Sequence, residues 1–136
     1  AAGSYDTAIT NAPWHPNSND ARLRKGYALY ELAKANKEEE KFLLAQASFG
    51  EARDSDESSM DLKGECSFMM GECLKEIRDY EGASRHFDDT TSRYASSGKW
   101  AEKAFDQAIY CYEKVGKPDQ IDRLEKRRDD WLRRYQ

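Results

Sequence analysis

The chain has 136 residues, of which 35% are charged and 38% belong to the hydrophobic set, and its formal net charge is −4. This length suits one domain with its own core, but so much charge confines that core to thin layers between amphipathic helices. The acidic balance argues against nucleic acid as the main partner. No apolar run approaches the roughly 18 residues of a membrane span, so membrane insertion is not expected.

The first helical signals are a short segment at 4–12 and a helix pair over about 18–53. The pair begins at capping candidates such as Ser18 and Asn19. Apolar residues then recur at steps of three and four, first Leu23, Tyr27, Tyr30 and Leu32, and later Phe42, Ala45, Phe49 and Ala52. This spacing predicts two amphipathic helices.

Two further helix pairs are predicted over about 57–94 and 99–135. The breaks between the helices are short, which forces consecutive helices to lie antiparallel. No segment of strand length alternates polar and apolar residues convincingly. The sequence therefore predicts an all-α, single domain over 1–136, with about seven helices arranged as one leading helix and three hairpins.

The hairpins also repeat one another. Ala45 and Phe49 in the first hairpin correspond to Ala83 and Phe87 in the second, each at an offset of 38 residues. The same offset relates Cys73 to Cys111, Leu74 to Tyr112, and the turn at 78–79 to the turn at 116–117. A fixed period of this length is the signature of a stacked array of helical repeats.

The residue types of the repeat resemble the tetratricopeptide repeat family. The family pattern is carried by Met70-Gly71, Leu74, Ala83 and Phe87, and again by Lys25-Gly26, Leu29, Ala45 and Phe49. Small residues at Gly71 and Ala83 are expected where the helices of one hairpin approach closely, with Phe87 filling the gap towards the next unit. The resemblance implies hairpins stacked as a right-handed superhelix, whose first helices line a groove for a peptide or protein.

Two departures qualify the resemblance. The period is 38 residues, where the family has about 34, and Glu125 stands at the Phe position of the third unit. The long period resembles arrays of bacterial envelope assembly and Tol-associated proteins. Tyr5–Ile9 resembles the start of a second helix whose first helix is missing.

By analogy with the family, each first helix contributes residues to the groove. These are Asp20, Leu23, Tyr27, Tyr30 and Glu31 in unit one, Glu65, Phe68, Glu72, Lys75 and Glu76 in unit two, and Lys103, Asp106, Tyr110, Glu113 and Lys114 in unit three. Aromatic residues are enriched at binding hot spots. We select the partner-binding residues Leu23, Tyr27, Tyr30, Phe68, Glu72, Lys75, Tyr110 and Lys114. The alternative is that some of these aromatic residues pack under the leading helix or under a neighbouring domain.

No motif for catalysis, phosphate binding or a metal is recognisable. Cys66 and Cys73 lie two helical turns apart, too far for a disulfide or a shared ion. Cys73 and Cys111 fall on neighbouring packed helices, about 8–10 Å apart, so they are not expected to pair either. Three free thiols favour a reducing, cytoplasmic compartment, whereas the family resemblance also allows the bacterial periplasm.

The sequence thus predicts a non-catalytic interaction module that binds a protein or peptide and needs no cofactor. The alternative is a structural fragment of a larger helical-repeat protein or complex, without a ligand groove of its own. Self-association is also open, because residues 37–65 carry nine acids and four bases, whereas residues 117–136 carry seven bases and five acids. Opposite ends of two copies could attract each other.

Overall fold

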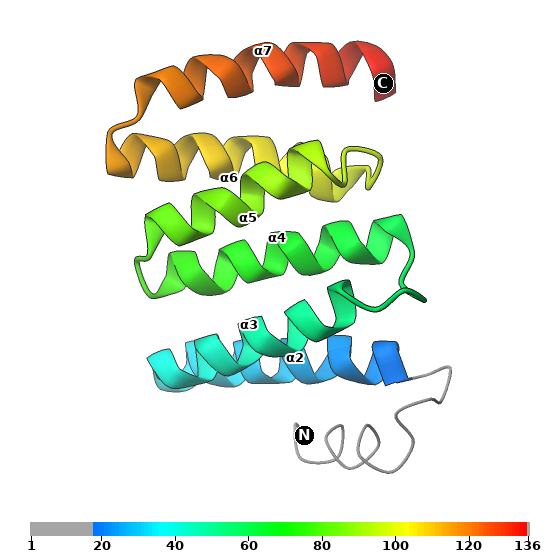
Figure 1. The fold of residues 1–136 in the computed structure, drawn as a ribbon. Coiled ribbons are helices and arrows are strands. Elements are labelled where there is room, and N and C mark those ends of the chain that lie inside the picture. Colours follow the sequence, from blue (N-terminus) through cyan, green and yellow to red (C-terminus); the bar gives the residue numbers. More distant parts are fainter. Residues whose placement is uncertain (1–17, 136) are drawn as a thin grey trace.

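The computed structural model describes residues 18–135, in which six helices and no strand occur. The helices are α2 (Ser18–Asn36), α3 (Glu39–Arg53), α4 (Met60–Glu76), α5 (Tyr80–Ser92), α6 (Lys99–Val115) and α7 (Pro118–Tyr135). They follow one another in a stack, each packed on the helices before and after it (Figure 1). The all-α prediction is confirmed. The leading helix expected at 4–12 lies outside the described residues.

The helix boundaries agree closely with the predicted hairpins. The largest difference is at α4, which begins at Met60 rather than at 57. The reason is local: the hydroxyl of Ser59 accepts a hydrogen bond of 3.1 Å from the backbone N–H of Leu62 and so caps the helix there. Asp79 caps α5 in the same way, accepting from the N–H of Gly82 at 3.0 Å.

The turn inside each hairpin passes through one residue in the left-handed region. These residues are Lys37 (φ 55°), Arg78 (φ 64°) and Gly116 (φ 71°). Glycine adopts this conformation freely, whereas a residue with a Cβ does so at a cost. The three hairpins therefore turn alike, although glycine occupies the position in the third alone.

A glycine on the first helix meets a phenylalanine on the second helix in two hairpins. A Cβ added to Gly71 would lie 2.7 Å from the ring of Phe87, and one added to Gly26 would lie 2.8 Å from the ring of Phe49. Both rings are fully buried, as is Ala83. Phe87 thus fills the space inside its own hairpin, where it rests on Gly71.

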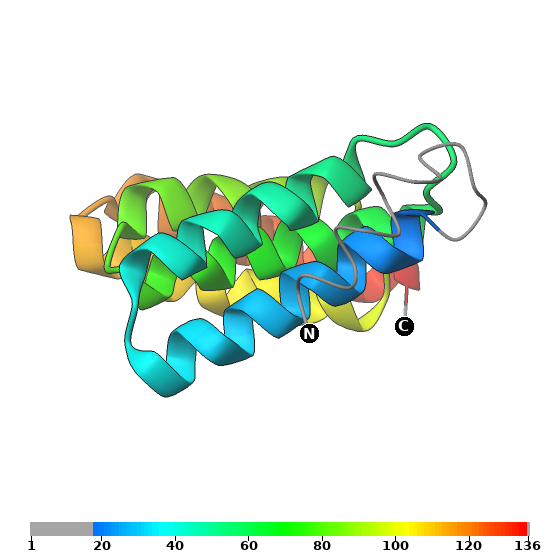
Figure 2. The same ribbon diagram turned by 90° about the horizontal axis from the view of Figure 1, so that it is seen from below.

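The second helices gather on one side of the stack. Figure 2 shows α3 and α5 on one side and α2 and α6 on the other. Consecutive hairpins also meet through their first helices, since α4 contacts α6 directly. The arrangement is two layers of helices with a thin core between them, as the charge content of the sequence requires.

The repeat register changes in α7. The residue 38 positions after Phe87 is Glu125, which is exposed, whereas Leu124 beside it is fully buried. Trp131 is the other buried residue of this helix and lies 5.8 Å from the ring of Phe105. The core residue of α7 that corresponds to Phe87 is therefore Leu124, at an offset of 37 residues and not the expected 38.

Asp88 on α5 ties the third hairpin to the second. Its carboxylate accepts hydrogen bonds from Arg127 at 2.8 Å, Arg123 at 2.9 Å and the hydroxyl of Tyr112 at 2.8 Å. Burial alone would raise the pKa of Asp88, but the hydrogen bonds from Arg127 and Tyr112 and the charge of the two guanidinium groups outweigh it. The pKa of Asp88 therefore lies below its ordinary value.

The contact between Gly71 and Phe87 leads to a first prediction. Gly71→Ala should lower the free energy of unfolding by about 1–3 kcal/mol, because a fully buried ring has no room to move away from the new methyl group. Gly50→Ala is the matched control, since its Cβ would meet the flexible end of Met70 at 3.2 Å. We expect Gly50→Ala to be neutral or stabilising by up to about 1 kcal/mol. Chemical denaturation measures both variants, and equal losses would contradict this packing.

The carboxylate of Asp88 leads to a second prediction. Asp88→Asn should cost about 1–3 kcal/mol at neutral pH by breaking a partly buried ion pair. Because the folded-state pKa is lowered, the contribution of Asp88 is complete above the ordinary carboxyl pKa and is lost as the pH falls through the folded value. The stabilities of wild type and variant should therefore converge in acid. A difference that is constant from pH 7 down to about pH 3 would argue against the ion pair.

Candidate functional site

The first helices of the three hairpins form a continuous surface, which we call the first-helix face. Hydrogen bonds between side chains join its helices. The hydroxyl of Tyr27 on α2 donates to Glu65 on α4 at 2.5 Å, and the ammonium of Lys75 on α4 donates to Gln107 on α6 at 2.6 Å. Burial raises the pKa of Tyr27, as does the Glu65 carboxylate, so this phenol stays protonated as a donor.

The first-helix face is hollowed between α4 and α6 near the turn at Arg78. The hollow, here called the α4–α6 cleft, has a volume of about 630 Å³. Its lining residues are Lys75, Glu76, Arg78, Tyr80, Asp106, Gln107 and Tyr110. This volume falls within the range of ligand sites in proteins, but the lining is mostly polar, which suits a peptide better than an apolar small molecule.

The charged groups of the cleft are of two kinds. Lys75 pairs with Glu72 at 3.2 Å, and Asp106 pairs with Arg128 at 3.0 Å, so both of these charges are compensated inside the chain. Arg78 and Glu76 are exposed, and no hydrogen bond or ion pair within 18–135 engages their side chains. The cleft therefore offers one cation and one anion to a partner.

Two tyrosines form the aromatic part of the cleft. The rings of Tyr80 and Tyr110 lie 6.0 Å apart in an edge-to-face arrangement, and 41% of Tyr110 is exposed. The ammonium of Lys114 lies 5.3 Å from the centre of the Tyr110 ring. An exposed aromatic ring that is held on one edge is a rigid contact surface, with little side-chain entropy left to lose on binding.

The backbone at Arg78 is strained, and the strain falls inside the cleft. The equivalent turn of the third hairpin has Gly116, which takes a positive φ without penalty. A non-glycine residue in this region costs about 1 kcal/mol or more, and such positions cluster at functional sites. At Arg78, as at Lys37, a residue with a Cβ thus occupies a turn position that glycine adopts at lower cost.

Of the residues selected from the sequence, four gather at the cleft. Lys75 and Tyr110 line it. Lys114 lies against the ring of Tyr110, and Glu72 adjoins the cleft through its ion pair with Lys75. The structure therefore brings these four residues together, and their binding of a partner stays a prediction.

The other four lie elsewhere, and two of them require a correction. Tyr30 is 7% exposed and Phe68 is 8% exposed, so neither is open to a partner. Tyr30 packs edge-on against Phe42 of its own hairpin, and Phe68 lies between Phe87 and Trp100. The partly buried Leu23 and Tyr27 pack against the same core.

Three residues of the cleft were not found from the sequence, namely Arg78, Tyr80 and Gln107. Arg78 and Tyr80 belong to the turn and to the start of the second helix, whereas the family analogy selects positions on first helices. Gln107 lies on the side of α6 that faces α4 and is read as polar surface in the sequence. The signal available was the 38-residue match of Arg78 to Gly116, which marks Arg78 as an unusual turn residue.

No group of three or more His, Cys, Asp or Glu side chains within 18–135 could hold a metal ion. His86 is partly buried, and burial lowers its pKa, so it is neutral near pH 7. None of the described helices has the length and apolar character needed to cross a membrane.

The three cysteines are free and buried, as predicted. Burial raises the pKa of Cys66 and of Cys73 to about 12 each and that of Cys111 to about 11. A thiol is nucleophilic as the thiolate, so these groups are unreactive in the folded protein.

Comparison of the chain with protein-family models, with curated proteins and with solved structures gives no match.

The state of the thiols leads to a third prediction. In the native protein near pH 8, Ellman's reagent should label none of the three cysteines within the time in which it labels all of them in guanidinium chloride, because the native thiols are both protonated and shielded. A free cysteine tripeptide provides the reference rate. Rapid labelling of one thiol in the native protein would show that its helix opens locally.

Proposed function

We propose that the chain is a non-catalytic interaction module that binds a protein or peptide segment at the α4–α6 cleft of the first-helix face. The observation that carries the proposal is the combination of an exposed, edge-held tyrosine with a cation and an anion that have no partner inside the described chain. Elsewhere on this face Tyr30 and Phe68 are buried, Tyr27 and Trp100 are partly buried, and many of the charged groups are paired.

The repeat pattern supports the same proposal. Hairpins that turn alike and pack a phenylalanine on a glycine fit the resemblance to the tetratricopeptide repeat family, and we infer a superhelical array of that kind. In such arrays the first helices present the binding surface. Membership of the long-period, envelope-associated arrays rests on the period of 38 residues.

The cleft also indicates the kind of segment that fits. Arg78 suits an acidic group, Glu76 suits a basic group, and the Tyr110 ring offers a flat apolar surface beside them. A partner segment with charges of both signs flanking an apolar or aromatic residue would satisfy all three. Charged groups of both signs also exclude partners with a single strong charge.

The alternative function is structural, as a section of a larger helical-repeat assembly. It is favoured by the exposed leucines of the first hairpin, where Leu32 is 42%, Leu43 46% and Leu44 55% exposed. In that case the first hairpin, not the cleft, would carry the main contact. The two proposals therefore differ in which surface loses binding on mutation.

The proposal leads to a fourth prediction, built on Tyr110→Ala and Arg78→Gly. Each should weaken binding of the partner by about tenfold or more, the effect of removing a hot-spot contact. Arg78→Gly should at the same time leave the free energy of unfolding within about 1 kcal/mol of wild type, because glycine relieves the backbone strain while loosening the unfolded chain. Loss of binding without loss of stability would separate recognition from folding.

The experiment is affinity capture followed by titration of the recovered partner. Lys126→Gln on the exposed face of α7 is the control, and a variant with Leu43 and Leu44 changed to Ser tests the structural alternative. Partners retained by the control and lost by the cleft variants support the proposal. Partners lost by the leucine variant and kept by the cleft variants would replace it with the alternative.

A further inference from the structure

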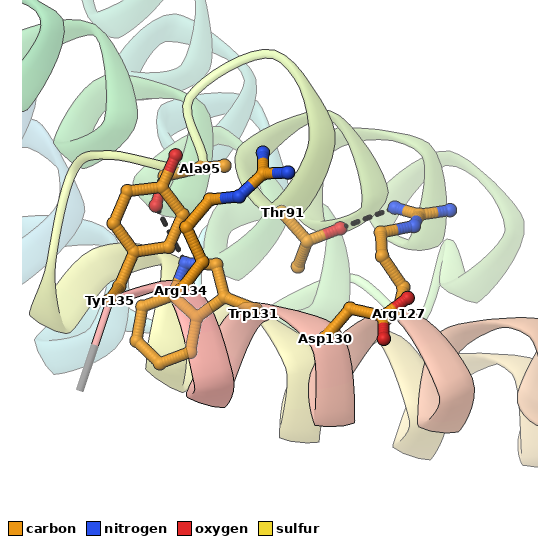
Figure 3. Close-up of a pocket in the computed structure, with 7 residues that line it drawn as sticks. All are labelled: Thr91, Ala95, Arg127, Asp130, Trp131, Arg134 and Tyr135. Carbon is orange, nitrogen blue, oxygen red and sulfur yellow. Dashed lines mark hydrogen bonds between the residues drawn. The ribbon is translucent and has the colours of Figure 1, made fainter.

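A second hollow lies between the end of α5 and the end of α7. This hollow, here called the α5–α7 pocket, has a volume of about 270 Å³, and Figure 3 shows its lining. The lining residues are Thr91, Ala95, Arg127, Asp130, Trp131, Arg134 and Tyr135. The pocket shares no residue with the α4–α6 cleft and lies at the opposite end of α5, so any binding there is a separate event.

The aromatic wall of the pocket is fixed. The indole N–H of Trp131 donates to the carbonyl of Ala95 at 2.7 Å, and Trp131 is 5% exposed. The ring of Tyr135 lies 5.6 Å from that of Trp131. A ligand would therefore meet a preformed apolar surface and would not have to order it.

The two guanidinium groups of the lining are in different states. Arg127 donates to Asp88 at 2.8 Å and to Thr91 at 2.7 Å, so its charge is compensated and its position is set. Arg134 is exposed and has no hydrogen bond or ion pair within 18–135. Figure 3 shows Arg134 and Arg127 on either side of Thr91.

The single carboxylate of the lining does not cancel Arg134. Asp130 pairs with Arg133 at 3.0 Å, and Arg133 is not part of the lining. The pocket thus carries about one uncompensated positive charge next to an aromatic wall. One carboxylate matches this charge, whereas a phosphate with nearly two negative charges exceeds it.

We propose that the α5–α7 pocket binds an acidic side chain of a peptide partner, with an adjacent apolar side chain against Trp131 and Tyr135. Arg134 forms the ion pair with the carboxylate, since a guanidinium presents parallel N–H donors that match two carboxylate oxygens. The volume is enough for a side chain or two and too small for a folded element. The chain then contacts a peptide at a second place, away from the first-helix face.

The test is a titration of the ¹⁵N-labelled protein with the dipeptide N-acetyl-Glu-Phe-amide, followed by NMR. The indole N–H signal of Trp131 should shift in a saturable way, while the indole signal of Trp100, on the other side of α6, stays in place. N-acetyl-Gln-Phe-amide, which differs in charge alone, should bind about fivefold or more weakly. Added salt should weaken the binding of the Glu dipeptide and leave the binding of the Gln dipeptide unchanged.

Arg134→Gln should remove this preference for Glu over Gln. Lys126→Gln is the matched control, because it takes away the same charge from an exposed position of the same helix, lies outside the lining and leaves the Asp130–Arg133 pair intact. Neither side chain is buried, so both variants should fold. Equal binding of the two dipeptides, an unchanged preference in Arg134→Gln, or no shift of Trp131 with either dipeptide would each overturn the proposal, while binding at the α4–α6 cleft would be unaffected.

Discussion

The contact of a phenylalanine ring with a helical glycine sets the geometry of the first two hairpins. Phe49 on Gly26 and Phe87 on Gly71 bring the helix axes closer than any side chain at the glycine would allow. Because the rings are fully enclosed, the helices of each hairpin are held in one packing, and the glycine meets the ring in the same way in both hairpins. The position of α4 relative to α2 and α6, and so the cleft on the first-helix face, follows from this contact.

The junctions between hairpins use different chemistry in successive repeats. The residue 38 positions before Asp88 is Gly50, which packs against the end of Met70. At the junction between the second and third hairpins, Asp88 instead accepts hydrogen bonds from two guanidinium groups and a phenol. At this repeat position, therefore, one junction has an apolar contact and the other has charged groups. The second kind also fixes Arg127, and with it one wall of the α5–α7 pocket.

Most of the fold could be predicted from the sequence because its signals are local. A cap such as Asp79 fixes where a helix begins, and apolar steps of three and four fix which side of it is buried. The site could be predicted less well, because exposure depends on neighbours distant in sequence. Phe68 has the spacing of a surface residue and is covered by Trp100 from the next hairpin. The register of α7 changed for a similar reason, since Leu124 completes the core better than Glu125.

The way α7 is attached has a consequence for how the molecule comes apart. Two of its residues, Leu124 and Trp131, are buried, and its hydrogen bonds to α5 are those of Arg123 and Arg127 to Asp88 and of Arg127 to Thr91. A helix held by so few buried groups opens at a lower free energy than the rest of a domain. Under mechanical force or on heating, α7 should therefore detach first, while the two hairpins with a phenylalanine–glycine contact stay folded. A ligand bound between α5 and α7 would stabilise the docked position of α7. The force or temperature needed to detach this helix would therefore rise with the ligand concentration.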